Sequence, residues 1–232
     1  MKYFYDLHIH SALSPCGDED MTPNNIVNMA MLLGLDMIAV TDHNSAANLR
    51  SVQEVSKGKL KLIPGIEVTT SEEVHMLCYF PSIDAAEDMA VLLKENMQKI
   101  DNRPEIFGRQ LIMNSKDEII GEEKQLLTTA VGLDIYDIRH ETTLRGGMLV
   151  PAHIDRSSYS IISNLGFFPP DLEVDGIEIT AGGLEKHKNI CKNLKIFTSS
   201  DAHYLENISE PEFFVDSGEI MTNKLVEFLC NI

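Results

Sequence analysis

The sequence predicts an α/β fold of the TIM-like barrel type. Short apolar runs of β type alternate with stretches of helical period, which is the pattern of a largely parallel sheet covered by helices. About six to eight such strand–helix units fit a barrel that is distorted or incomplete. The chain has 232 residues, 44% of them hydrophobic, so it can bury the core of such a domain. We expect a single domain over residues 1–232.

The first half of the chain gives the clearest element boundaries. Strands are expected at 3–9, 37–41, 60–66 and 74–80, and helices at 24–33 and from about 45 to 55. Thr22 before Pro23 is a helix N-cap followed by proline at the first helical position. Gly34 is the residue type that ends a helix, so the first helix is expected to stop there.

The middle of the chain has few strand signals. Residues 84–99 show a helical period, and residues 105–141 are expected to be mostly helical, with a turn at 114–117. We therefore expect a helical insertion or lid over about 87–144. Strands resume at 148–152, 176–179 and 195–199, and a helix at 222–229 closes the sequence.

The charge balance excludes several classes of partner. There are 19 Lys and Arg against 36 Asp and Glu, a formal charge of −17. Such a chain repels the phosphates of nucleic acids and the anionic surface of a membrane, so we expect no nonspecific binding to either. The apolar runs are far shorter than the roughly 20 residues that span a bilayer, and no secretory signal is recognisable. We expect a cytoplasmic protein, and its oligomeric state is open.

The four cysteines are scattered at Cys16, Cys78, Cys191 and Cys230, without a CxxC pair. This spacing predicts reduced thiols rather than a zinc knuckle or a thioredoxin-type site. A phosphocysteine role for Cys16 is an alternative, but the loop of a cysteine-dependent phosphatase is absent around it. We favour a loop thiol.

Six of the eight histidines fall at the ends of predicted strands. His8 and His10 are two residues apart on the first strand, so their side chains face the same side. Later strands end in or carry Asp42 with His43, Glu67, His75, His153, and Asp201 with His203. The carboxyl ends of barrel strands meet at one face, so we expect these groups to gather there. His140 and His187 lie in polar stretches and are expected on the surface.

Imidazole combined with carboxylate suits Zn, Fe or Mn, whereas Mg and Ca sites are usually all oxygen. A single histidine is more often structural than a ligand, and Asp42 or Asp201 could cap a helix. The shared placement nevertheless favours a metal site. Glu67 can bridge through its two oxygens, and more than four ligands imply two or three divalent ions.

The same residues form motifs that resemble a known family. DLHIHS at 6–11, AVTDHN at 39–44, GIE at 65–67, PAH at 151–153 and SSDAH at 199–203 are similar to the ordered motifs of the PHP family, the polymerase and histidinol phosphatase domain. The resemblance runs from residue 6 to about residue 206. It implies a distorted (β/α)7 barrel, a cluster of usually three metal ions at the strand ends, and phosphoester hydrolysis.

The resemblance also implies the ligands. Carried over by position, they are His8, His10, Asp18, His43, Glu67, His75, His153, Asp201 and His203. The acidic motif is stretched in this chain, so Asp20 is the alternative to Asp18. The implied sets are His8, His10, Glu67 and Asp201 for one ion, Glu67, His75 and His153 for a second, and Asp18, His43 and His203 for a third.

The expected substrate is a small phosphomonoester, a nucleotide or the end of a short oligonucleotide. A metal-bound water, on ions held by Glu67 and Asp201, would supply hydroxide, because metals lower the pKa of bound water from about 15.7 to about 7. Arg156, three residues after His153, is expected to bind the phosphate, with Arg145 and Lys186 as weaker candidates. The alternatives are a metal-dependent amidohydrolase, disfavoured because no predicted strand ends in lysine, and a non-catalytic metal-binding regulatory domain.

Overall fold

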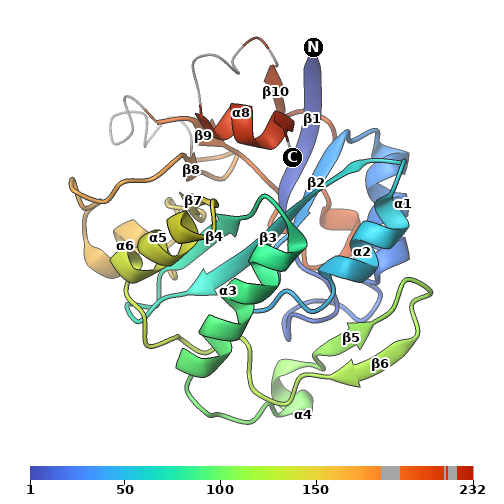
Figure 1. Cartoon of the computed structure of the whole chain (residues 1–232), viewed down its shortest axis with the longest axis horizontal. Coiled ribbons are helices and arrows are strands. Elements are labelled where there is room, and N and C mark those ends of the chain that lie inside the picture. Colours follow the sequence, from blue (N-terminus) through green and yellow to red (C-terminus); the bar gives the residue numbers. More distant parts are fainter. Residues whose placement is uncertain (184–193, 217, 219–223, 232) are drawn as a thin grey trace.

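The computed structural model describes residues 1–183, 194–216, 218 and 224–231. A curled sheet of six strands forms its centre, in the order β10-β1-β2-β3-β4-β7 (Figure 1). Their bounds are Phe214–Asp216 for β10, Lys2–Ile9 for β1, Met37–Val40 for β2, Lys61–Thr69 for β3, His75–Tyr79 for β4 and Met148–Pro151 for β7. The predicted α/β class is confirmed, as a curled half-barrel.

The prediction of a largely parallel sheet is wrong in part. β1, β2 and β3 are parallel, but β4 is antiparallel to both β3 and β7, and β10 is antiparallel to β1. Between β3 and β4 lie only residues 70–74. A parallel crossover needs about a dozen residues or more, and this short connection therefore forces β4 to reverse direction.

A short parallel pair, β8 (Ile177–Glu178) and β9 (Ile196–Phe197), continues the curl. Ile154 N donates to the carbonyl oxygen of Glu178 at 3.0 Å, which joins the end of β7 to β8. His10 N donates to the carbonyl oxygen of Ala202 at 2.9 Å, which joins the segment after β9 to the end of β1. The segments that follow β7 and β9 therefore lie close to the end of β1.

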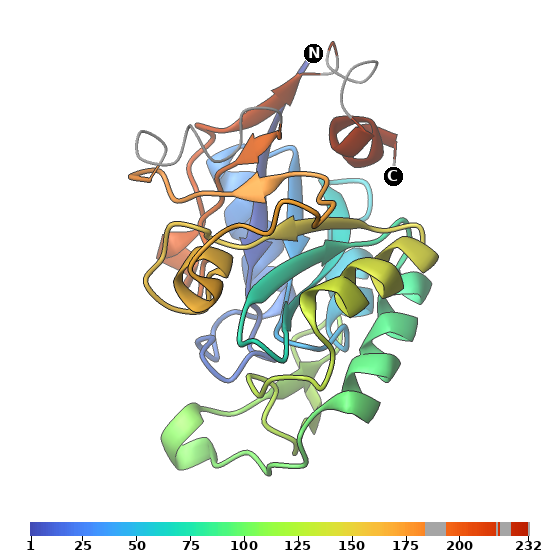
Figure 2. The ribbon, with the colours of Figure 1, turned by 90° about the vertical axis from the view of Figure 1, so that its left-hand side faces the viewer.

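Helices surround the sheet (Figures 1 and 2). They are α1 (Pro23–Leu33), α2 (Leu49–Ser56), α3 (Ile83–Asn96), α5 (Ile135–Leu144), α6 (Ile161–Leu165), the 3-10 turn η1 (Leu205–Asn207) and α8 (Lys224–Asn231). α1 begins and ends as predicted, since Thr22 Oγ1 accepts from Asn25 N at 3.3 Å and Gly34 is left-handed. No helix in the described ranges is long and apolar enough to cross a membrane.

The expectation of a mostly helical middle is wrong. Between α3 and α5 lie only the one-turn helix α4 (Pro104–Phe107) and a hairpin of β5 (Leu111–Met113) and β6 (Ile119–Glu122). The turn predicted at 114–117 is the turn of this hairpin. Ile119 and Ile120 are exposed β-branched residues, which favour an edge strand over a helix with a buried face.

This middle segment lies at the end of the molecule opposite the chain termini, beyond the carboxyl ends of β1 and β2 (Figures 1 and 2). Leu111 N donates to the carbonyl oxygen of Ala12 at 2.8 Å. Met113 N donates to Asn48 Oδ1 at 2.9 Å. The hairpin is thus bonded to the loops that follow β1 and β2, where the predicted ligands begin.

Candidate metal centre

The sequence-predicted histidines of the strand ends come together in one cavity of about 380 Å³. Its lining includes His43, Glu67, His75, His153, Asp201 and His203, and His8 and His10 lie buried directly beneath Glu67 and Asp201. His75 is the first residue of β4, not the end of a strand as expected. Because β4 is antiparallel to β3, its first residue reaches the edge at which β3 ends.

Glu67 is the centre of the cluster and is buried. Its Oε1 lies 2.9 Å from His75 Nδ1, 3.3 Å from His8 Nε2 and 3.4 Å from His153 Nε2, and its Oε2 lies 3.2 Å from His10 Nε2 and His43 Nδ1. Glu67 Oε1 and His43 Nδ1 nevertheless make no hydrogen bond. Buried polar atoms are normally satisfied, so ring nitrogens and carboxylate oxygens crowded together without hydrogen bonds indicate a site for a cation.

Four side chains form a set with the spacing of a tetrahedral metal site. The Nε2 atoms of His8 and His10 lie 3.2 Å from each other and 3.2 Å from Asp201 Oδ1. Each also contacts one oxygen of Glu67, at 3.3 Å from His8 and 3.2 Å from His10. Donors at about 2.0–2.1 Å from a tetrahedral zinc ion lie about 3.3 Å from one another. These residues therefore fit a divalent ion without rearrangement.

A second carboxylate fixes the orientation of His8. Glu178 lies 3.0 Å from His8 Nδ1, and a carboxylate only accepts, so Nδ1 carries the proton and the Nε2 lone pair faces the cluster. Glu178 also accepts a hydrogen bond from the backbone N–H of His153 at 2.9 Å. It is buried, on the two-residue strand β8. The sequence analysis missed this residue.

His10 and His203 are oriented in the same way. Ser14 Oγ donates its single proton to Asp42 Oδ1 at 2.7 Å, so it can only accept from His10 Nδ1, which lies at 2.9 Å. His203 Nδ1 lies 2.8 Å from the carbonyl oxygen of Asp201, which also only accepts. In its neutral form each ring therefore carries the proton on Nδ1 and leaves Nε2 as the nitrogen that can bind a metal. Asp42 acts here through Ser14 and does not join the cluster.

The described residues contain three groups whose ligand atoms lie within 4.8 Å of one another. They are His8, His10, Glu67 and Asp201; His43, Glu67 and His75; and His10, Cys16, His43 and His203. Asp18 is in none of them. Its Oδ1 accepts instead from Asp20 N at 2.9 Å, and Asp20 is exposed. His153 adjoins the second group through its contact with Glu67.

The electrostatics of the cluster favour added positive charge. Burial disfavours a charged His10, but the hydrogen bonds and charges of Asp201 and Glu67 outweigh it and raise its pKa to about 9. Burial and the neighbouring His10 lower the pKa of His203 to about 4. Burial also opposes ionisation of Glu67, yet the surrounding histidines hold its pKa well below the usual range. Divalent ions would meet ionised carboxylates here.

Arg156 lies at this cavity, as predicted. Its Nη1 is 2.5 Å from Asp201 Oδ2, and its side chain is 44% exposed. Tyr159 lies beside it, with its ring stacked on His75 at a centroid distance of 4.7 Å. The weaker candidates differ. Arg145 pairs with Glu141 and Asp88 outside the cavity, and Lys186 lies outside the described residues.

The backbone is strained where it presents the site. Asn44, His153, Tyr159 and Asp201 have φ values of 47°, 28°, 53° and 52°, in the left-handed region that favours glycine. Non-glycine residues are rarely held there unless the surroundings enforce it, and such residues concentrate at functional sites.

The two histidines that were predicted on the surface are not part of the cluster. His140 is exposed on α5, and His187 lies outside the described residues.

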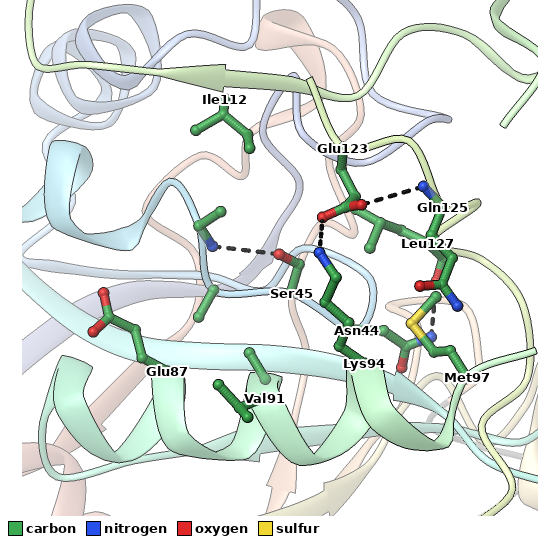
Figure 3. Close-up of a pocket in the computed structure, with 13 residues that line it drawn as sticks. Asn44, Ser45, Glu87, Val91, Lys94, Met97, Ile112, Glu123, Gln125 and Leu127 are labelled. Atoms are coloured by element: carbon green, nitrogen blue, oxygen red, sulfur yellow. Dashed lines mark hydrogen bonds and ion pairs between the residues drawn. The ribbon is translucent and has the colours of Figure 1, made fainter. Parts of the chain in front are cut away.

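A second cavity of about 340 Å³ lies between α3 and the hairpin (Figure 3). Its walls are mostly apolar, with the ion pair of Lys94 and Glu123 at 2.7 Å on one side. Asn44, next to His43, contributes to its lining, and the Asn44 amide donates to the carbonyl oxygen of Leu127 at 2.7 Å. The lining contains no histidine, in contrast to that of the first cavity.

Comparison with known proteins agrees with this geometry. A family model described as the PHP domain matches residues 6–206. The 5'-3' exoribonuclease Rnm of Escherichia coli K12 is 29% identical over 114 residues, which are 46% of this chain and 37% of that protein. The matched stretch is therefore less than half of either protein.

Two solved structures share the fold. One is a proposed metal-dependent phosphoesterase from Bifidobacterium adolescentis, with a TM-score of 0.67, 19% identity and coverage of 97% of this chain and 95% of that one. The other is a lesion-specific endonuclease from Pyrococcus furiosus, with a TM-score of 0.64, 19% identity and coverage of 88% of this chain and 49% of that one. The chain spans about half the length of the endonuclease.

Proposed function

The chain belongs to the PHP domain family, and on that premise we propose that it hydrolyses a phosphoester with two or three divalent ions held around Glu67. The observation that carries the proposal is the near-tetrahedral set of His8, His10, Glu67 and Asp201. Metal-dependent phosphoester hydrolysis is the activity that the family and its relatives support. Zn, Fe and Mn fit the mixed imidazole and carboxylate donors.

The contacts of each side chain indicate its proposed role. When bound, such ions hold phosphoryl oxygens and lower the pKa of a bound water from about 15.7 to about 7. Glu67 joins the groups, because its Oε1 faces His75 and its Oε2 faces His43. Asp201 directs Oδ1 to the histidines of β1 and Oδ2 to Arg156.

Arg156 is the proposed phosphate-binding cation. We expect Arg156→Ala to lower kcat/KM about 10- to 100-fold, the value of about 1.5–3 kcal/mol for a hydrogen bond to a charged group. The metal content should be unchanged, since no proposed ligand is removed. Arg145→Ala is the matched control, because Arg145 follows α5 directly and pairs with Glu141 away from the cavity. Unchanged kinetics of Arg156→Ala on every phosphoester tested would exclude the role.

The proposed substrate is a nucleotide, the end of a short oligonucleotide or a small phosphomonoester. Two relatives are named for action on nucleic acids, as an exoribonuclease and a lesion-specific endonuclease. The cavity is also lined by Phe107 and Tyr159, which are 38% and 48% exposed and offer ring faces on which a base could stack. The charge of −17 argues against long contacts along a nucleic acid and favours an end that enters the cavity.

The middle segment is proposed to form one wall of this cavity rather than a helical lid. Phe107 of α4 and Thr128 both line it. We further propose that residues 1–232 are one PHP-type domain, in which β8 and β9 complete the (β/α)7 barrel of the family.

The test is a screen of phosphoesters with measured metal content. The protein is loaded with Mn, Fe or Zn and offered p-nitrophenyl phosphate, nucleoside mono- and bisphosphates and short oligonucleotides. We expect two to three ions per chain, and hydrolysis that is lost with a chelator and restored by metal. Full activity of folded, metal-free protein would refute the proposal. Bound metal without hydrolysis would favour the regulatory alternative, and amide hydrolysis alone would favour the amidohydrolase.

A further inference from the structure

The loop after β1 brings a thiol into the cluster. Cys16 Sγ and one ring nitrogen each of His10, His43 and His203 lie within 4.8 Å of one another. Cys16 is solvent-accessible and lines the same cavity as Glu67. We propose that Cys16 is a ligand of one of the metal ions, together with His43 and His203, while His10 Nε2 belongs to the neighbouring set with His8, Glu67 and Asp201. The inference rests on the metal-dependent function proposed above and assigns one donor of that site.

Asp18 and Asp20, the aspartates expected at this position, are not among the grouped donor atoms. Asp18 Oδ1 closes a local turn by accepting from Asp20 N at 2.9 Å, and Asp20 itself is exposed. Asp18 N donates to the carbonyl oxygen of His203 at 2.9 Å, which fixes the backbone that follows Cys16 next to one of the proposed ligands. The residue that the loop turns into the cavity is the cysteine.

The loop is built to hold this position. Ser14 Oγ contacts His10 Nδ1 and accepts from His43 N at 3.2 Å, and the carbonyl oxygen of Ser14 accepts from Gly17 N at 2.9 Å. One serine therefore links two of the histidines to the turn that carries Cys16. A Cβ at Gly17 would lie 2.5 Å from the carbonyl oxygen of Ser11, so this close turn requires glycine.

His43 and His203 present the nitrogen donors that such a site needs. In its neutral form His203 carries the proton on Nδ1 and leaves Nε2 free, and its ring stacks on that of His10 at a centroid distance of 4.2 Å. His43 Nδ1 is buried and makes no hydrogen bond. One thiolate and two imidazoles are nitrogen and sulfur donors of the kind that zinc takes, with a fourth position left open as in catalytic sites.

The thiolate gives this position a preference among metals. Thiolate is a soft ligand that favours Zn and other thiophilic ions, whereas carboxylate and water suit Mn and Mg. The position with Cys16 should therefore discriminate against Mn, while the position formed by His8, His10, Glu67 and Asp201 offers oxygen and nitrogen alone. The cluster would hold non-equivalent ions.

Cobalt(II) tests the ligand directly, since it replaces zinc and gives a near-ultraviolet charge-transfer band only when a thiolate binds it. The full-length chain is loaded with cobalt(II) as wild type, Cys16→Ser and Cys78→Ser. Cys78 is the matched control, because it is buried and contacted by the Thr142 hydroxyl at 3.3 Å, away from the cavity. We expect the charge-transfer band in wild type and in Cys78→Ser, and its loss in Cys16→Ser. Cys16→Ser should keep the weaker absorption of cobalt bound at the other metal positions.

Zinc affinity provides the second measurement. Removal of a residue that only orients a metal ligand lowers metal affinity about 10- to 100-fold. Cys16→Ser removes a proposed ligand itself, so it should weaken one zinc site by at least that factor. Manganese binding should be weakened less. Comparable thermal unfolding of the metal-free variants confirms that the loop change leaves the fold intact. A band that persists in Cys16→Ser, or wild type that binds two or more cobalt ions without the band, overturns the assignment while phosphoester hydrolysis still stands. Wild type that binds no cobalt and hydrolyses no phosphoester overturns the proposed function itself.

Discussion

Simultaneous replacement of His8 and His10 by alanine is expected to abolish hydrolysis. Both Nε2 atoms belong to the near-tetrahedral set with Glu67 and Asp201. The double variant therefore removes two of the four ligands of that set. Loss of a catalytic metal costs several kcal/mol of transition-state stabilisation, so kcat/KM for p-nitrophenyl phosphate or a nucleotide should fall by about 10³-fold or more.

Metal content and folding separate this effect from unfolding. The double variant should bind at least one ion fewer per chain, while its metal-free form still unfolds cooperatively, because β1 keeps its backbone pairs with β2 and β10. His140→Ala is the matched control, since His140 is an exposed histidine on α5. Wild-type activity in the double variant would show that the cluster is not the reaction centre.

Most of the cluster could be predicted because the residues follow strands. His43 and His153 follow β2 and β7 by three and two residues, and Glu67 lies two residues before the end of β3. Strand ends converge in any α/β barrel. His8 and His10 were predicted to share a face, and the structure places their rings 5.2 Å apart at the centroids. Periodicity and strand ends suffice for this part of the site.

The partners that orient these ligands could not be predicted in the same way. Glu178 belongs to a strand of two residues, and its role depends on a contact with His8 at a sequence separation of 170 residues. Cys16 and Asp18 are both polar residues of one loop, and the path of the turn decides which of them faces the cavity. A loop path depends on individual hydrogen bonds, and no periodic pattern records them.

Two features of the fold differ from the prediction, the direction of β4 and the secondary structure of the middle segment. The direction of a strand cannot be derived from an apolar run, so the sheet as a whole was expected to be largely parallel. The short connection between β3 and β4 allows only a reversal of direction. The hairpin of β5 and β6 was expected to be helical because its strands have three and four residues, too few to show alternation. Its turn at Asn114 was the part that composition did indicate.

Glu178→Gln is expected to weaken metal binding about 10- to 100-fold, as removal of an outer-shell partner of a metal-ligating histidine does. The carboxylate of Glu178 accepts from both His8 Nδ1 and His153 N. Glutamine keeps the size but has one acceptor oxygen and one NH₂ group that donates. His8 Nδ1 lies 3.0 Å from Oε2 and 3.2 Å from Oε1 of Glu178, so the NH₂ group faces the Nδ1 proton whichever oxygen position it takes. To relieve this contact His8 must move its proton to Nε2, where it would block the lone pair that faces Glu67.

The measurement is metal affinity by chelator competition, with the thermal unfolding of the metal-free protein as the second readout. Glu173→Gln makes the same chemical change at an exposed position and should leave affinity unchanged. The effect on metal-free stability should be smaller than in Glu178→Ala, which leaves both donors without an acceptor in a buried site. Equal metal affinity in Glu178→Gln and wild type would show that the tautomer of His8 does not depend on this carboxylate. A loss confined to affinity would instead mean that β8 contributes the proton acceptor that keeps the His8 lone pair directed at the ion.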